Sequence, residues 1–259
     1  NIRMRDLLKD YDLNKLTIGV LGGHSALEVC EGAKKLGFRT LVVCEKGREK
    51  TYAKLYKTRG EKGCVDEVLV LEKFGDIVKP DVQKKLRKLN TIFVHHRYFW
   101  VYCDFNEIEK DFHVPIFGTR HLLRREERDV KENQYWLLEK GGIRLPKMFA
   151  SASKIDRPVI VKVNEAHRSY ERAFFVATSA EDFETKSSAM VKAGTITKEG
   201  LKKAVIEEYV LGAQVNFNFF YSALSDDLEF FVTDSRRQTC LVGFLRLDAK
   251  TQIELLDSG

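Results

Sequence analysis

Short apolar runs alternate with amphipathic segments along the first part of the chain. The apolar runs cover residues 16–22, 38–45, 66–71, 91–96 and 114–118, and segments with helical spacing cover 25–37 and 80–89. The first of these helices has Ser25 where an N-cap is expected and ends at Gly37. Buried strands that alternate with amphipathic helices predict a parallel sheet with right-handed crossovers, which is a Rossmann-like α/β domain.

The pattern changes after Gly118. The spacing predicts helices over 120–129, 131–140, 180–193 and 197–203, and strands over 159–163, 173–179, 205–210, 214–223 and 228–236. Strands that alternate or pair through short polar connections are typical of antiparallel sheets. The sequence therefore predicts an α/β domain over residues 1–118 and an α+β domain over residues 119–259.

Composition and charge narrow the class of protein. The chain has 259 residues, of which 32% are charged and 44% hydrophobic, as in a soluble globular protein. The net charge of +6 is moderate, and basic runs such as 84–88 and 124–125 are broken by acids nearby. This distribution favours a phosphate-bearing small ligand over a nucleic-acid groove, which needs a denser basic stripe.

The cysteines indicate a reducing compartment. They are five in number and scattered, without a C-x-x-C pair or histidines at zinc spacing. An odd, dispersed set indicates reduced thiols and a cytoplasmic protein. No apolar run reaches the roughly 18 residues that a membrane helix needs, so we expect no contact with a membrane.

Two segments of the second half carry the pattern of a nucleotide site. Lys162 lies in the apolar strand VIVKV (159–163), where an ammonium is costly unless it has an anionic partner. The strand VIEEYVLG (205–212) ends in carboxylates and backbone groups that could hold a base and a ribose. The pair predicts a nucleotide with its phosphates near Lys162 and its adenine along 207–210. The alternative is a lysine that reaches solvent beside an ordinary acidic strand end.

Polar residues of the first half gather where strands end. Gly22-Gly23-His24-Ser25 and His95-His96 both follow predicted parallel strands, at the edge where ligands of such sheets bind. The amino end of the helix over 25–37 favours an anion there. The alternatives are a tight turn at the glycines and a plain N-cap at Ser25. Further on, Arg120 and Arg124 could bind phosphates or pair with Glu127.

Several motifs together resemble one family. They are GGHSALEVCEGAKKLGF (22–38), HVPIFGTRHLLRREE (113–127), GGIRLPK (141–147), VIVKV, VIEEYVLG and GFLRLDAKTQ (243–252). The order of elements is similar to that of ATP-grasp enzymes, which commonly carry a Rossmann-like domain in front. The motifs are similar to those of the archaeal formate-dependent FAICAR synthetases, which are ligases of IMP biosynthesis.

The resemblance implies an activity and a set of site residues. The family uses ATP, with magnesium, to activate formate as formyl phosphate, which then formylates the amine of AICAR (5-aminoimidazole-4-carboxamide ribonucleotide). The residues that this implies are Lys162, Glu207, Glu208, Tyr209 and Val210 for ATP, and His24, Ser25, Tyr98 and Cys240 for the substrate.

The chain departs from the family pattern at several of these positions. The loop after Lys162, residues 164–173, contains no glycine, although the family has a glycine-rich loop there. Tyr98 stands where a substrate-binding serine is expected, with Arg97 at the position of a glycine, and Cys240 stands where an amide is expected. The strand pair that carries the metal ligands of the family lies beyond the matched motifs, so no metal ligand is assigned.

These departures leave alternatives open. One is an ATP-grasp ligase with a different acceptor, and another is a non-catalytic nucleotide-binding subunit that pairs with an active relative. Aromatic strands such as 216–221 fit either a core or a subunit interface, which leaves a homo-oligomer open as well.

Overall fold

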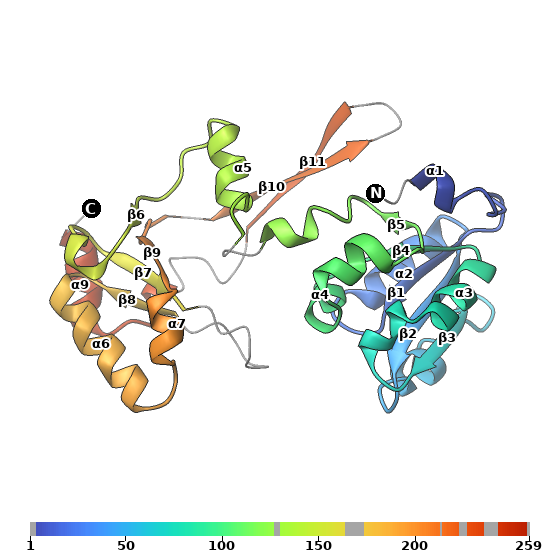
Figure 1. The fold of residues 1–259 in the computed structure, drawn as a ribbon, viewed down its shortest axis with the longest axis horizontal. Helices are drawn as coiled ribbons and strands as arrows, with labels where there is room; N and C mark the ends of the chain where they lie inside the picture. The colour runs from blue at the N-terminus through green and yellow to red at the C-terminus, as the bar shows by residue number, and fades with distance from the viewer. Residues whose placement is uncertain are drawn as a thin grey trace. The chain divides into compact units, whose positions relative to one another are not determined.

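The fold is described from a computed structural model. It describes residues 4–126, 130–163, 174–212, 214–222, 227–235 and 243–257. The chain divides into two compact units, Asn1–Gly142 and Ile143–Gly259, and each is described by itself (Figure 1).

The first unit is built on a five-stranded parallel sheet. Its strands, in spatial order, are β3 (Glu67–Leu71), β2 (Arg39–Glu45), β1 (Thr17–Leu21), β4 (Thr91–Val94) and β5 (Ile116–Phe117). All neighbours are parallel, and Gly19 of β1 pairs with Leu41 on one side and Phe93 on the other. The chain runs outward from β1 to β3 and then returns to β4, so the order reverses between β1 and β4. The predicted Rossmann-like sheet is confirmed.

Helices and helical turns precede, connect and follow these strands (Figure 1). They are α1 (Met4–Leu7), α2 (Ala26–Lys35), the π-helical turn η1 (Thr51–Leu55), the 3-10 turn η2 (Phe74–Val78), α3 (Pro80–Lys88), α4 (Tyr98–Tyr102), the π-helical turn η3 (Glu107–Asp111), the 3-10 turn η4 (Leu123–Glu126) and α5 (Gln134–Lys140). The helices predicted over 25–37 and 80–89 are confirmed. Helix α4 has no counterpart in the prediction, because its sequence YFWVY is apolar all round and shows no helical period.

The helices predicted over 120–129 and 131–140 are shorter than expected. Of the first, the described residues show only the 3-10 turn η4. The buried Arg120 explains this, because its guanidinium donates to the carbonyls of Ile108 at 2.9 Å and Phe112 at 2.7 Å and fixes the chain before the turn. The second begins at Gln134, because the Asn133 side chain accepts from the first N–H groups of α5 and caps it there.

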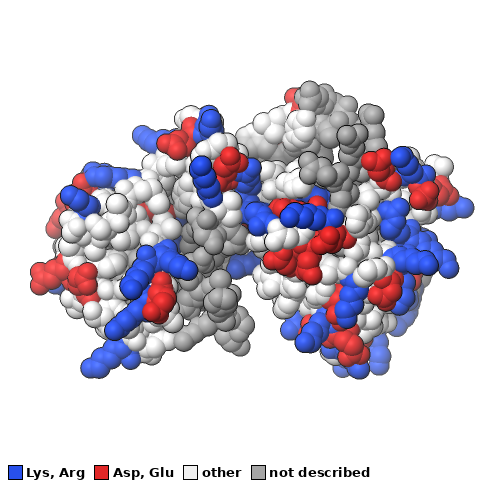
Figure 2. All heavy atoms as spheres, viewed as in Figure 1, with Lys and Arg blue, Asp and Glu red and all other residues white. Residues whose placement is uncertain are grey.

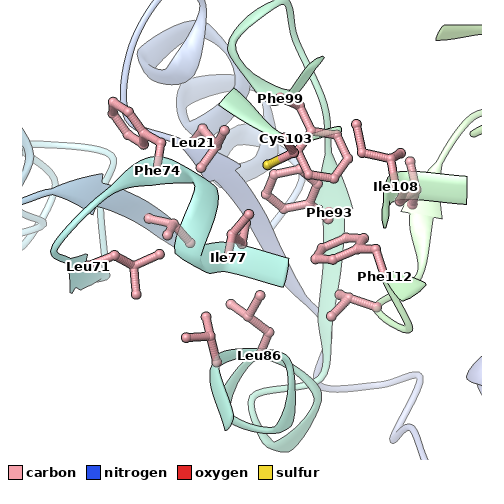
Figure 3. Packing of buried hydrophobic residues seen from close by; sticks show 14 of the residues in the cluster. Leu21, Leu71, Phe74, Ile77, Leu86, Phe93, Phe99, Cys103, Ile108 and Phe112 are labelled. Atoms are coloured by element: carbon pink, nitrogen blue, oxygen red, sulfur yellow. The ribbon is translucent and has the colours of Figure 1, made fainter. Parts of the chain in front are cut away.

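Aromatic side chains fill the core on one side of the first sheet. Phe93 of β4 is fully buried and packs against Phe99 and Phe112 at ring-centroid distances of 4.9 and 5.6 Å (Figure 3). Leu21, at the end of β1, belongs to the same cluster. The end of β1 and the end of β4 are therefore held by one packed core.

The second unit contains a four-stranded antiparallel sheet. Its strands are β6 (Met148–Phe149), β9 (Val205–Glu208), β7 (Val159–Lys162) and β8 (Phe174–Ala177), with the 3-10 turn η5 (Ala152–Lys154) and the helices α6 (Ala180–Lys192), α7 (Lys198–Lys202) and α9 (Ala249–Asp257). The strands and helices predicted over 159–163, 173–179, 180–193, 197–203 and 205–210 are confirmed within the described residues. The last helix, α9, was not predicted.

The two faces of this sheet differ. Val159, Val161 and Ile206 point to the face where α6 contributes Phe183 to a buried cluster. The register places Ile160 opposite Glu207, so that Glu207 and the next outward position of β7, Lys162, share the other face. The apolar face is thus covered by helices, and the charged pair lies on the opposite face.

A separate hairpin completes the second unit. Strands β10 (Val215–Ser222) and β11 (Asp227–Ser235) pair antiparallel, with an irregularity between Asn218 and Phe219. The strands predicted over 214–223 and 228–236 are confirmed within the described residues. Phe217 is 63% exposed and Tyr221 is 58% exposed, so the described side chains do not form the core that one of the two predictions expected. The alternative, a subunit interface, stays a prediction.

The division into units does not coincide with the predicted boundary near Gly118. The segment after Gly118 remains with the first unit, because Leu123 joins its core and Arg120 bonds to its backbone. The compact unit ends only at Gly142. Residues 1–118 and 119–259 as the two domains in the family sense stay a prediction.

The surface and the thiols agree with the composition. Figure 2 shows basic and acidic side chains interspersed on the visible face. Cys30, Cys44, Cys64 and Cys103 are buried with free thiols, and loss of hydration raises the pKa of Cys30, Cys44 and Cys103 to about 12. Among the described residues, no helix is long and apolar enough to cross a bilayer.

Candidate functional sites

The turn between β1 and α2 carries the first candidate site. His24 adopts φ 35°, a left-handed conformation that costs energy in a residue with a side chain. Ser25 occupies the N-cap position of α2, but its hydroxyl makes no capping bond. Its Oγ lies 2.6 Å from His24 Nδ1 instead. The plain N-cap reading of Ser25 is therefore wrong, and the amino end of α2 keeps its attraction for an anion.

His96 links the ends of the two central strands. Its Nε2 lies 2.9 Å from the carbonyl oxygen of Leu21, which can only accept, so Nε2 carries the proton. Its Nδ1 accepts from the backbone N–H of Tyr98 at 3.3 Å. The ring also stacks on that of His24, with centroids 5.9 Å apart. The buried, neutral His96 ring thus supports the His24 ring at the point where the strand order reverses. We call this stacked arrangement of the two rings the His96 platform.

His95 lies beside this platform. Its Nδ1 is buried and has no hydrogen-bond partner among the described residues, and its ring meets the edge of Trp100 at 6.0 Å. Burial, with a smaller contribution from the neighbouring His96, lowers the pKa of His95. Burial also lowers the pKa of His96. Both rings are therefore held neutral in the folded protein.

This arrangement predicts that acid destabilises the first unit. The unfolded chain takes up protons on His95 and His96 below about pH 6.5, while the folded chain resists protonation. The free energy of unfolding is expected to fall as the pH drops from 7.5 to 5.5, by up to about 1.4 kcal/mol per pH unit for each histidine. Denaturant titrations followed by tryptophan fluorescence measure this, because both tryptophans, Trp100 and Trp136, lie in the first unit.

A matched variant isolates the contribution of His96. Glutamine at this position can still donate to the Leu21 carbonyl but does not titrate in this range. The pH dependence in His96→Gln is expected to be flatter than in the wild type. An unchanged slope would show that the titration of His96 contributes nothing to it.

Tyrosine rings pack closely against the two glycines of the turn. A Cβ built on Gly23 would lie 2.1 Å from Cε2 of Tyr98, and one on Gly22 would lie 2.9 Å from Cε2 of Tyr52. Tyr52 is a contact that the sequence did not predict, because it lies thirty residues further along the chain in η1. Of the predicted substrate residues, the structure thus brings together His24, Ser25 and Tyr98.

The second candidate site is the charged pair on the face of the antiparallel sheet opposite the apolar cluster. Lys162 Nζ forms an ion pair with Glu207 Oε1, and the two side chains are only 18% and 7% exposed. The anionic partner that a strand lysine needs is therefore present. The alternative of a lysine that simply reaches solvent is wrong, because the ammonium bonds to a carboxylate within the sheet.

The residues after Glu207 lie at the strand end. Glu208 accepts from the Lys147 N–H at 3.0 Å and from Arg157 at 3.3 Å, and these bonds, the backbone one foremost, lower the pKa of its carboxyl. The Tyr209 N–H donates to the Pro158 carbonyl at 2.9 Å. Val210 is 52% exposed. Glu208 is thus ionised and already bonded within the strand end, and Val210 remains available as an apolar surface.

Arg120 and Arg124 have structural partners. Arg120 is buried on backbone carbonyls, and burial lowers the pKa of its guanidinium. Arg124 pairs with Glu109 at 3.0 Å, and the predicted partner Glu127 lies outside the described residues. The phosphate-binding alternative for Arg120 is wrong, because its donors serve the Ile108, Phe112 and Val114 carbonyls inside the fold.

Two predicted features lie outside the described residues, namely Cys240 and the loop 164–173. Among the residues that the structure describes, no three His, Cys, Asp or Glu side chains gather as metal ligands. No magnesium ligand is therefore assigned among the described residues.

Comparison with known proteins places the chain in a family. Residues 18–149 match the family described as "Protein of unknown function (DUF1246)", and residues 182–258 match "Domain of unknown function (DUF1297)". The chain belongs to the DUF1246 family. The β1–α2 turn with His24 and the platform with His96 both lie inside the DUF1246 match.

Curated relatives agree with the resemblance seen in the motifs. The chain is 40% identical over 251 residues to "5-formaminoimidazole-4-carboxamide-1-(beta)-D-ribofuranosyl 5'-monophosphate synthetase" of Methanothermobacter thermautotrophicus. It is 37% identical over 250 residues to the protein of the same name in Methanocaldococcus jannaschii. Each alignment covers 96% of this chain and 66% of the relative, so this DUF1246 chain spans slightly less than two thirds of their length.

Solved structures show the fold. An IMP biosynthesis protein, PurP, from Thermococcus kodakaraensis superposes with a TM-score of 0.56 at 24% identity, over 85% of this chain and 59% of that one. The ADP complex of PurK, an N5-carboxyaminoimidazole ribonucleotide synthetase, gives 0.61 at 12% identity, over 94% and 61%. The predicted fold of this DUF1246 chain, a Rossmann-like domain followed by an ATP-grasp domain, is confirmed.

Proposed function

We propose that this chain belongs to an ATP-dependent carbon–nitrogen ligase that formylates AICAR to FAICAR with formate, in IMP biosynthesis. The observation that carries the proposal is the 40% identity, over 96% of this chain, to relatives named for the synthesis of this product. The activity of the whole protein, its substrates and its use of magnesium are parts of the proposal. A cytoplasmic location, the absence of nucleic-acid binding and the open alternative of a homo-oligomer stay predictions.

The reaction consists of two transfers. An oxygen of formate attacks the γ-phosphorus of ATP, the bond to the bridging oxygen breaks, and formyl phosphate and ADP form. The amine of AICAR then attacks the formyl carbon, its C–O bond to phosphate breaks, and the nitrogen loses a proton. Most of the catalysis in such transfers comes from positioning and from charge stabilisation.

Lys162 supplies charge stabilisation in this proposal. Its ammonium has three donors, so it can keep the bond to Glu207 and still donate to a phosphate oxygen. The partly buried position strengthens such a bond, because little water competes there. Glu207, Glu208, Tyr209 and Val210 would border the adenosine at the end of the same strand.

The β1–α2 turn is the proposed place of the AICAR phosphate. The uncapped amino end of α2 and the His24–Ser25 pair present donors at the carboxyl edge of the parallel sheet. The ring of the neutral His96 stacks on the ring of His24 and supports it. Cys240, which lies outside the described residues, is retained as a substrate contact from the resemblance.

Calorimetric titration with AICAR tests the proposal, in the presence and absence of a non-hydrolysable ATP analogue and magnesium. Binding in the micromolar range, together with ADP release stimulated by formate plus AICAR, is the expected result. Binding of the ATP analogue without any effect of AICAR would leave the fold standing and contradict the purine assignment.

A second candidate is an ATP-grasp ligase with a different acceptor. The observation that favours it is Tyr98, which replaces the expected serine. Its ring packs against Gly23 of the β1–α2 turn, which we call the acceptor turn. In the same titration this candidate predicts affinity for the ATP analogue alone. A non-catalytic nucleotide-binding subunit would also bind the nucleotide, but no amine acceptor would then stimulate ADP release.

A further inference from the structure

We propose that Tyr98 is a positioning residue of the acceptor site, which acts through the packing of its ring on Gly23 and not through its hydroxyl. The inference deepens the proposed function, since it concerns the turn assigned to the AICAR phosphate. It differs from the role implied by the resemblance, where a serine at this position contacts the phosphate directly.

The contact with Gly23 is the first argument. The three atoms nearest to a Cβ on Gly23 are Cε2, Cδ2 and Cζ of Tyr98, at 2.1, 2.5 and 3.0 Å. All three belong to one ring, which therefore occupies the space of the missing side chain. Gly23 is not among the residues with positive φ, so its backbone would accept alanine. The ring of Tyr98 is thus the nearest obstacle to a side chain at this position.

The ring of Tyr98 is itself held in place. It meets Phe74 at 5.9 Å, Tyr102 at 5.4 Å and His96 at 5.5 Å between ring centroids, each time edge-on. Its backbone N–H donates to His96 Nδ1. Such edge-to-face contacts restrict the rotation of an aromatic side chain. The Tyr98 ring is therefore a fixed surface on which Gly23 of the β1–α2 turn packs.

The packing of the Tyr98 ring on Gly23 constrains the next residue, His24. This residue directly follows Gly23, and it holds φ 35° while its ring stacks on His96. A conformation of this kind persists only when its surroundings enforce it. A serine at position 98 is too small to fill the space beside Gly23, so the turn would lose this support. In this chain the ring orders His24 and Ser25 for a ligand that it need not touch.

Three variants and one control test the inference. Tyr98→Phe keeps the ring and removes the hydroxyl, whereas Tyr98→Ser removes both. Gly23→Ala places a methyl group where the ring lies, and the double variant Gly23→Ala with Tyr98→Ser removes that collision. Tyr56→Ser is the control, since Tyr56 is 43% exposed in the same unit.

The measurements are the NMR signals of the His24 imidazole without ligand, the dissociation constant of AICAR, and KM and kcat. Tyr98→Ser is expected to shift the His24 signals and to weaken AICAR binding about 10- to 100-fold, the size expected for a misplaced binding group. The KM for ATP and the control variant should change little. The loss in Tyr98→Phe should be a small part of the loss in Tyr98→Ser.

Non-additivity is the decisive outcome. Gly23→Ala alone should weaken AICAR binding, but the double variant should bind no worse than Tyr98→Ser, because the alanine then meets no ring. Losses that simply add, or an equal loss in Tyr98→Phe and Tyr98→Ser, would overturn the inference. If the wild type binds no AICAR, the proposed function fails, while the His24 signals of the same variants still test the role of Tyr98.

Discussion

Replacing Lys162 by alanine is expected to lower kcat about 10²- to 10³-fold, the usual effect of removing one charge-stabilising donor from a transition state. The ammonium lies on the face of the antiparallel sheet that carries Glu207, and it is mostly buried there with that carboxylate. ADP release in the presence of formate and AICAR measures the loss. Lys202→Ala is the matched control, because Lys202 is exposed on α7 of the same unit and has no assigned role.

The ion pair requires a second variant. Lys162→Ala removes the cation that bonds to the Glu207 carboxylate, whose side chain is 7% exposed, and the loss of one partner of a buried ion pair destabilises a fold. The double variant Lys162→Met with Glu207→Gln removes both charges and keeps their volume. It should fold well and remain inactive. If it regained wild-type turnover, the role of Lys162 would be confined to the pair with Glu207, and the phosphate assignment would be wrong.

The fold could be predicted from the sequence where periodicity is strong. The strands over 16–22 and 159–163 are short apolar runs between turn signals, and the structure confirms them as β1 and β7. Helix α4 could not be found, since it is apolar on all sides, and the helix expected over 120–129 was interrupted by the burial of Arg120. Tertiary contacts decided both cases, and local pattern does not contain them.

The candidate sites, like the fold, could be predicted from local sequence only in part. The sequence alone predicted His24 at the end of a parallel strand, where ligands of such sheets bind. It also predicted Lys162 within an apolar strand, where an ammonium needs an anionic partner. It left the partner of Lys162 open, and only the antiparallel register brings Glu207 to the same face. The platform of His96 and the contact of Tyr52 with Gly22 join residues far apart in the chain, which a single sequence does not reveal.

Replacing Phe93 by alanine is expected to lower the free energy of unfolding of the first unit by about 3–5 kcal/mol. Phe93 is fully buried between Phe99 and Phe112, and its removal leaves a cavity that the packed strands cannot close (Figure 3). Denaturant titration followed by tryptophan fluorescence reads this unit alone. Phe117→Ala, at a phenylalanine 53% exposed on β5, is the control and should lose much less.

The Phe93→Ala variant also tests whether the core supports the acceptor turn. Phe93 lies on β4, three residues before His96, and the core cluster that contains it also contains Leu21, whose carbonyl accepts a hydrogen bond from His96. A cavity at Phe93 should therefore weaken AICAR binding in the folded protein while affinity for the ATP analogue persists, because Lys162 and Glu207 belong to the second unit. An equal loss of both affinities, or an unfolding free energy as high as that of Phe117→Ala, would contradict this account of how the core supports the acceptor turn.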